Sequence, residues 1–144
     1  MSYLALDLSK TNTGWAQWKE GWDRPIFGSF KLGSEFTSIG GMCGKLYREL
    51  TAIHAASPVR FGFIEKPLTA SQLHGNTNAD ALFMLAAIAA HAHSFGYLKG
   101  WVGQGVTEIN IATWRRHFIG KMQRGTKSKD LKQYVMERCR QLGL

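Results

Sequence analysis

The sequence predicts an α/β fold with a mixed five-stranded sheet, in which an antiparallel meander is joined to parallel strands and helices lie on both faces. Three short runs of strand character follow one another closely at the start of the chain and predict the meander. Segments of helical spacing then alternate with short apolar segments, which predicts helices that connect further strands. The 144 residues show no internal repeat or linker, so we expect a single domain.

The first half of the chain accounts for four strands and one helix. Turn residues separate the predicted strands, which are residues 3–8, 15–19, 26–32 and 59–65. Before the fourth strand, residues 38–56 repeat apolar side chains at helical spacing, and Ser57-Pro58 ends this pattern. The apolar side of this predicted helix consists of Ile39, Met42, Leu46, Leu50 and Ile53.

The second half predicts a long apolar helix, one more strand and a basic C-terminal helix. Residues 79–95, with Asn78 as the expected cap, are apolar on nearly all sides. This helix is therefore either central in the fold or part of an oligomer contact. Residues 105–110 have the pattern of a strand, Thr113 begins a turn or short helix, and the last helix is expected at residues 127–142.

Composition favours a soluble cytoplasmic protein. No apolar leader opens the chain, because Asp7 and Lys10 interrupt the N-terminal region. The most apolar stretch, residues 79–92, is shorter than the roughly 20 residues that cross a bilayer, so we expect no membrane contact. Cys43 and Cys139 have no partner motif, which suits a reducing compartment.

The net charge of +8 is concentrated at the C-terminal end of the chain. Residues 115–144 carry nine Lys or Arg against two Asp or Glu, a net charge of +7, whereas residues 1–114 carry nine against eight, a net charge of +1. A patch of this kind favours a polyanionic partner, since each phosphate that it neutralises releases condensed counterions. The alternative is a solvated helix face in a protein that is simply basic.

Two carboxylates follow apolar strand segments. Asp7 comes after Tyr3-Leu4-Ala5-Leu6, and Glu65 comes after Phe61-Gly62-Phe63-Ile64. An ionised carboxylate in apolar surroundings is costly unless a cation satisfies it. If the two strands are neighbours, their carboxylates can share a divalent ion, because ligands gather at the carboxyl ends of parallel strands. The alternative for Asp7 is a strand-end aspartate that pairs with a nearby lysine.

Two motifs resemble those of the RuvC-type Holliday junction resolvases of the ribonuclease H-like superfamily, in their bacterial or phage versions. The first motif is Leu6-Asp7-Leu8-Ser9 with Thr13-Gly14-Trp15-Ala16, and the second is Phe63-Ile64-Glu65-Lys66-Pro67. The segment that includes Ile109-Asn110, Trp114-Arg115-Arg116-His117-Phe118 and Lys127-Ser128-Lys129-Asp130 is similar to the part of the family that follows the next strand. The resemblance covers residues 3–142.

The resemblance implies a crossover junction endodeoxyribonuclease that resolves four-way DNA junctions by paired phosphodiester hydrolysis. We expect it to act as a homodimer, with residues 79–95 as the dimer helix. Asp7 and Glu65 would be catalytic and would bind Mg²⁺ or Mn²⁺, with two ions in the complete site. The residues expected to contact DNA are Lys10, Leu68, Gln72, Asn76, Arg115, Arg116, Lys121, Arg124, Lys127, Lys129 and Lys132. For each of them, an ordinary surface or loop role is the alternative.

The sequence departs from the family pattern in one respect. Family members carry a further acidic motif on a later helix, and neither Asp130 nor Glu137 matches its place. We therefore expect that the domain of residues 1–144 lacks this acidic helix or that the protein is catalytically weak. A non-catalytic nucleic-acid-binding module on the same fold is the second interpretation, and a ribonuclease H-like nuclease for RNA or flap substrates is the third.

Overall fold

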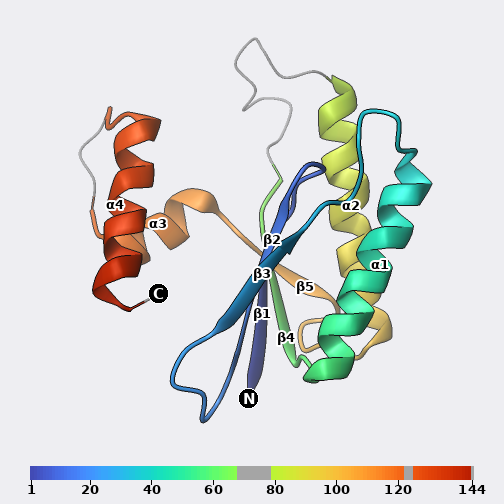
Figure 1. Ribbon diagram of the computed structural model, residues 1–144, viewed down its shortest axis with the longest axis horizontal. Helices are drawn as coiled ribbons and strands as arrows, with labels where there is room; N and C mark the ends of the chain where they lie inside the picture. Colours follow the sequence, from blue (N-terminus) through green and yellow to red (C-terminus); the bar gives the residue numbers. More distant parts are fainter. Residues whose placement is uncertain (68–78, 122–124, 144) are drawn as a thin grey trace. The chain divides into compact units, whose positions relative to one another are not determined.

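A computed structural model describes residues 1–67, 79–121 and 125–143 of the chain (Figure 1). Its strands are β1 (Ser2–Asp7), β2 (Thr13–Lys19), β3 (Ile26–Phe30), β4 (Phe61–Glu65) and β5 (Val106–Ile109). Its helices are α1 (Ile39–Ala56), α2 (Ala79–Leu98), α3 (Ile111–Ile119) and α4 (Ser128–Gln141). The chain forms two compact units, Met1–Glu108, with α1 and α2, and Ile109–Leu144, with α3 and α4.

The predicted mixed five-stranded sheet is confirmed, with the strand order β3-β2-β1-β4-β5. β1 pairs antiparallel with β2, and β2 pairs antiparallel with β3, as the predicted meander requires. β1 pairs parallel with β4, so that Tyr3 lies opposite Phe61 and Leu6 lies opposite Ile64. The central strand β1 therefore joins the antiparallel part of the sheet to the parallel part.

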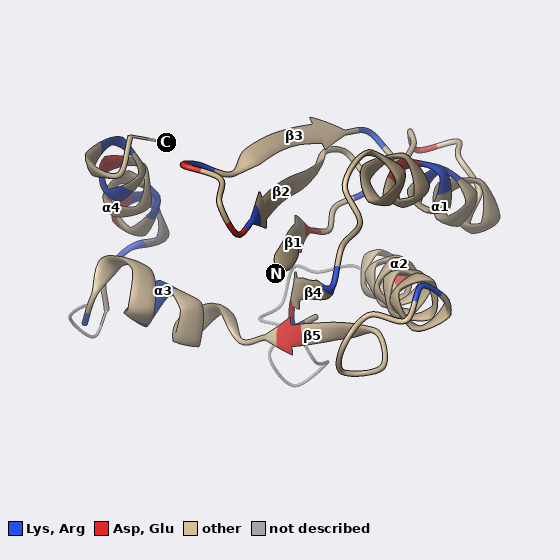
Figure 2. Cartoon of the chain, turned by 90° about the horizontal axis from the view of Figure 1, so that it is seen from below, with Lys and Arg blue, Asp and Glu red and all other residues tan. Residues whose placement is uncertain are grey.

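The core of the first unit lies between one face of the sheet and the helices α1 and α2, which Figure 2 shows on the same side. Buried and less buried side chains alternate along the strands, and Leu4, Leu6 and Ile64 are in this core. α1 adds Leu46 and Leu50, which are four residues apart and share one side of the helix. A helix layer on the other face stays a prediction, because α3 and α4 belong to the second unit.

The other face of the sheet carries aromatic rings. The Tyr3 ring stacks on Phe61 at a centroid distance of 5.2 Å and lies 5.6 Å from Trp18 and 6.4 Å from Phe63. These residues alternate with buried ones along their strands, so they project away from α1 and α2. On the same face Ala5 of the central strand is exposed.

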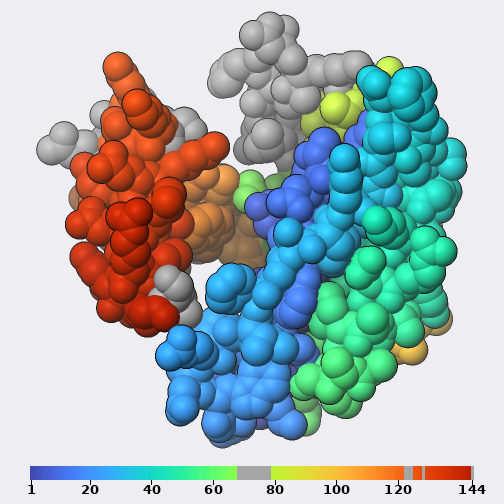
Figure 3. All heavy atoms as spheres, in the orientation of Figure 1, coloured from blue at the N-terminus to red at the C-terminus, as the bar shows by residue number. Residues whose placement is uncertain are grey.

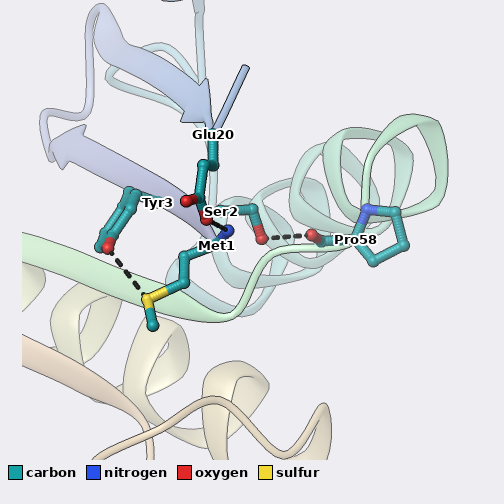
Figure 4. A network of polar contacts seen from close by, with 5 residues as sticks. All are labelled: Met1, Ser2, Tyr3, Glu20 and Pro58. Carbon is teal, nitrogen blue, oxygen red and sulfur yellow. Dashed lines mark hydrogen bonds and ion pairs between the residues drawn. The ribbon is translucent and has the colours of Figure 1, made fainter. Parts of the chain in front are cut away.

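Polar contacts hold the start of β1 in place (Figure 4). The Met1 ammonium group forms an ion pair with Glu20 at 2.6 Å, and the Tyr3 hydroxyl lies 3.4 Å from Met1 Sδ. The Ser2 hydroxyl donates a hydrogen bond to the Pro58 carbonyl at 2.6 Å. The Met1–Glu20 pair is exposed, so it adds little stability. Glu20 belongs to the connection between β2 and β3, a segment whose blue atoms lie at the surface in Figure 3. The Ser2–Pro58 bond is partly buried and ties β1 to the connection between α1 and β4.

α2 is longer than the sequence predicts. It continues through Gly96 to Leu98, whereas the sequence predicts that the helix ends at residue 95, before this glycine. The structure gives a packing reason for this glycine, because a Cβ atom there would crowd the Trp101 ring and the Gly105 carbonyl. Asn78, the expected cap of α2, lies outside the described residues.

α3 begins two residues earlier than the predicted start at Thr113. Asn110 caps it, since its side chain accepts a hydrogen bond from the Ala112 N–H group at 2.8 Å. Asn110 therefore separates β5 from α3, whereas the sequence predicts it as the last residue of the strand at 105–110. α4 lies within the predicted range of residues 127–142.

Trp101 fills the space that a glycine leaves on β4. It is buried, and a Cβ atom at Gly62 would overlap its ring. Its Nε1–H group donates to His54 Nδ1 at 3.4 Å, and the Val59 N–H group donates to the same nitrogen at 3.2 Å. Burial, with a smaller contribution from the charge of Lys99, lowers the pKa of His54 from its usual 6.5, which favours the neutral ring that can accept these bonds.

The contact between Gly62 and Trp101 can be tested by adding one methyl group. Gly62→Ala is expected to lower the free energy of unfolding by roughly 1–3 kcal/mol, because the methyl group overlaps the indole ring. Gly44→Ala, on α1, is the matched control, since the space there is open and alanine should stabilise the helix by roughly 0.5–1 kcal/mol. Urea denaturation measures both effects, and equal stability of the two variants would contradict the role of Trp101.

Candidate active site

The ends of two neighbouring strands bring Asp7 and Glu65 together. β1 and β4 run parallel with Leu6 opposite Ile64, and the next residues of the two strands are Asp7 and Glu65. Both strands end at these residues, at the carboxyl edge of the sheet, where α/β proteins bind ligands. The two strands that the sequence places before these carboxylates are therefore neighbours.

The turn after Asp7 is held by Thr13. The buried Thr13 hydroxyl donates a hydrogen bond to the Ser9 carbonyl at 2.6 Å and accepts one from the Ser9 N–H group at 3.1 Å. Gly14 lies opposite Asp7 in the pairing of β1 with β2 and places no side chain beside the carboxylate. The Asp7 side chain is exposed and, within the described part of the chain, has no hydrogen-bond or ion-pair partner.

A cavity of about 160 Å³ opens at the carboxylate pair. The residues that line it are Asp7, Leu8, Glu65, Lys66, Pro67, Leu85 and Ala89. Leu85 and Ala89 come from α2, one helical turn apart, and give the cavity an apolar wall. A volume of this size corresponds to about five water molecules at roughly 30 Å³ each, so it has room for a hydrated ion or a phosphate group.

Five of the seven residues that line this cavity are absent from the sites predicted from the sequence, namely Leu8, Lys66, Pro67, Leu85 and Ala89. Lys66 follows Glu65 directly, and that position alone could have identified it as a neighbour of the carboxylates. Leu85 and Ala89 could not have been identified in this way, because the apolar pattern of α2 indicates burial without showing which strand ends the helix approaches.

The donor set fits a hard divalent cation. Carboxylate oxygens are preferred ligands of Mg²⁺ and Mn²⁺, and Mg²⁺ is often held by one or two carboxylates while water and phosphate oxygens complete its coordination. Among the residues that the structure describes, no group of three or more His, Cys, Asp or Glu side chains lies together. Asp7 and Glu65 therefore match the protein's share of one such ion, and a site for two ions stays a prediction.

The residues predicted to contact DNA are spread over the chain. Lys10 lies between β1 and β2, where its carbonyl accepts hydrogen bonds from the N–H groups of Leu32 and Gly33, and it does not line the cavity. The second unit carries Arg115, Arg116, Lys121, Lys127, Lys129 and Lys132. Outside the described residues lie Leu68, Gln72, Asn76 and Arg124. The roles of all these residues stay predictions.

The second unit presents its positive charge to solvent. Lys129 and Lys132 on α4 are exposed, and none of the residues of α3 is buried. The Arg115 guanidinium lies 5.8 Å from the centroid of the Trp114 ring, which itself lies 6.1 Å from Phe118. Solvent-exposed charge is what phosphate binding requires, and it is also what a simple solvated surface would show.

Comparison with solved structures identifies the fold. The structure of T. thermophilus RuvC in complex with Holliday junction substrate matches with a TM-score of 0.73 over 100% of this chain and 81% of that chain, at 11% identity. A second Thermus thermophilus RuvC structure matches with a TM-score of 0.71 and the same coverage, at 14% identity. The chain has the RuvC fold. No family model and no curated protein matches the sequence, so the likeness rests on structure.

The RuvC fold confirms the resemblance that the two sequence motifs indicate. At 11–14% identity the comparison extends to the fold alone. The roles of individual residues in this RuvC-like chain depend on the geometry of its own strand ends and cavity.

Metal binding gives a direct test of the carboxylate pair. Asp7→Asn and Glu65→Gln should each raise the dissociation constant for Mn²⁺ at least about tenfold, a loss of about 1.4 kcal/mol, because each removes an anionic oxygen donor. Asp23→Asn, in the turn between β2 and β3, removes the same charge at a distance from the pair and should leave the constant unchanged. Electron paramagnetic resonance of free Mn²⁺ measures binding, and equal effects of all three variants would contradict a site at the pair.

Proposed function

We propose that this protein is a metal-dependent, structure-selective DNA endonuclease that resolves four-way junctions by paired phosphodiester hydrolysis. The observation that carries the proposal is the pair of adjacent carboxylates, Asp7 and Glu65, at the carboxyl ends of two parallel strands in a RuvC fold. A structural neighbour, RuvC, is in complex with a Holliday junction substrate, which supports branched DNA as the substrate class.

In this mechanism Asp7 and Glu65 hold the divalent cation at the open edge of the sheet. When bound, Mg²⁺ or Mn²⁺ supplies an activated water and stabilises the negative charge that develops on the phosphate and the leaving oxygen. The cavity beside the pair receives the scissile phosphate. The apolar side chains of Leu85 and Ala89, on α2, shield one side of this cavity from bulk water. The basic residues of the second unit neutralise phosphates elsewhere on the DNA.

We also propose that the protein acts as a homodimer, because a four-way junction offers two symmetric scissile phosphates and a twofold dimer makes paired cuts. The composition supports the further proposal that the protein is cytoplasmic. α2, with 20 residues and a mean hydropathy of 1.4, is long and apolar enough to cross a bilayer, which the shorter stretch of residues 79–92 is not. It nevertheless packs one side against α1 in the core. Its exposed apolar side chains Phe83, Tyr97 and Leu98, each more than 60% exposed, are our candidates for the dimer contact.

A second candidate function is a non-catalytic nucleic-acid-binding module on the same fold. The observation in its favour is that the described residues contain no third acidic or other metal-binding side chain beside Asp7 and Glu65. Such a module would bind junctions through the basic residues of the second unit and would leave them uncut.

Incubation with a labelled four-way junction and Mg²⁺ tests the catalytic proposal. The protein should make paired nicks, and Asp7→Asn should slow cleavage at least about a hundredfold, a loss of about 2.7 kcal/mol of transition-state stabilisation. Asp23→Asn should cut at the normal rate. Tight binding without nicks would favour the binding module, and preferential cutting of a flap or an RNA–DNA hybrid would replace the junction as the substrate.

The dimer contact can be tested independently of catalysis. Phe83→Arg should shift the protein toward the monomer by at least about tenfold in dissociation constant, because it puts a charge into a contact that is proposed to be apolar. Phe36→Arg is the matched control, since Phe36 is 89% exposed outside α2. Sedimentation velocity measures both variants, and a monomer at every concentration of the unmodified protein would contradict the dimer.

A further inference from the structure

Among the residues that the structure describes, Lys66 is the single cationic one that lines the cavity, where Asp7 and Glu65 also lie. Its side chain is exposed, and within the described part of the chain it forms no ion pair or hydrogen bond. A lysine that served only to balance the carboxylates would be expected to pair with Asp7, whose side chain also has no partner there. The positive charge at this cavity is therefore available to a ligand.

The backbone explains why Lys66 is at the cavity. Leu6 and Ile64 are paired in the parallel strands. Leu8 and Lys66, two residues further along each chain segment, therefore occupy equivalent positions after Asp7 and Glu65. Pro67 disfavours a helical conformation at Lys66, so the chain continues in the extended direction of β4. Leu8 and Lys66 line the same cavity as the α2 wall, which is consistent with the alternation of side chains along a strand.

We propose that Lys66 contacts the phosphate group that Asp7 and Glu65 receive with the metal, an inference that rests on the proposed function. Two carboxylates repel a phosphate, and one divalent ion only balances their charge, so an ammonium group beside them adds positive charge that attracts the anion. An ammonium group is a compact point charge with three donors, and it suits a phosphate oxygen whose position is fixed by other ligands.

Lys10 is the other lysine close to the carboxylates in the sequence, and the structure distinguishes the two. Lys10 does not line the cavity, and its backbone is held in the turn by Leu32 and Gly33. Lys66, and not Lys10, therefore lies at the cavity beside the carboxylates, and the contact of Lys10 with a DNA phosphate stays a prediction.

Junction binding in the presence of a fixed concentration of Ca²⁺, a hard cation that oxygen donors bind, gives the first test, since its salt dependence counts phosphate contacts. Lys66→Gln should reduce the slope of log K against log salt concentration by about 0.9, the value for one lost contact, and Lys66→Arg should keep the slope. Lys19→Gln, at the opposite end of the sheet beside Ser2, removes the same charge and should also keep the slope. An unchanged slope for Lys66→Gln would overturn the proposal, and thermal melting confirms that each variant is folded.

Cleavage gives the second test and separates this inference from the proposed function. At saturating protein, Lys66→Gln should slow single-turnover cleavage by at least about tenfold, while Lys66→Arg and Lys19→Gln stay within about twofold. A neutral methylphosphonate at the mapped scissile position should weaken binding by the unmodified protein and not by Lys66→Gln. Normal cleavage by Lys66→Gln would overturn the inference and leave the nuclease intact. A changed salt slope in a protein that never cuts would support the phosphate contact and reject the nuclease.

Discussion

The parallel pairing of β1 with β4 is the constraint on which the rest of the first unit depends. Its register places Leu6 beside Ile64, so two aliphatic side chains enter the core and the carboxylates that follow them emerge together at the edge of the sheet. Because side chains alternate along a strand, a shift of one residue would bury a carboxylate and expose an aliphatic side chain. Core packing and site geometry therefore select the same register, and the hydrophobic stabilisation of the core holds the two carboxylates side by side.

The same register places two negative charges side by side at the edge of the sheet. Two like charges at adjacent strand ends repel each other, and exposure to water limits the cost because solvent screens them. A bound cation relieves this repulsion, so the same repulsion between the two carboxylates favours metal binding. The positive charges of the chain are divided accordingly, with Lys66 at the cavity and the excess of Lys and Arg in the second unit.

Local patterns predicted most of the fold, and tertiary relations account for what they missed. Strand alternation and helical spacing predict the meander, α1 and α4 because each pattern reports which side chains are buried. The continuation of α2 through Gly96 and the early start of α3 at Asn110 depend on a packing contact and a cap, which outweigh local tendencies. Asp7 and Glu65 were identifiable because a charge within an apolar run is conspicuous, whereas the wall of Leu85 and Ala89 depends on where a helix lies against strands that are distant in the sequence.

Trp101 has a consequence for the cavity, although it lies away from it in the sequence. Its ring separates β4 at Gly62 from α2 at Gly96, and these two elements carry Glu65 and the wall residue Leu85. The helix rises about 1.5 Å per residue, so Leu85 lies about 16 Å along α2 from this contact. If α2 tilted by about 5° about its contact with the indole, Leu85 would move by about 1.4 Å. This displacement is a large fraction of the width of a phosphate oxygen. Because Trp101 packs against both Gly62 and Gly96, a change in the shape of this contact would shift the apolar wall of the cavity without altering any residue that lines it.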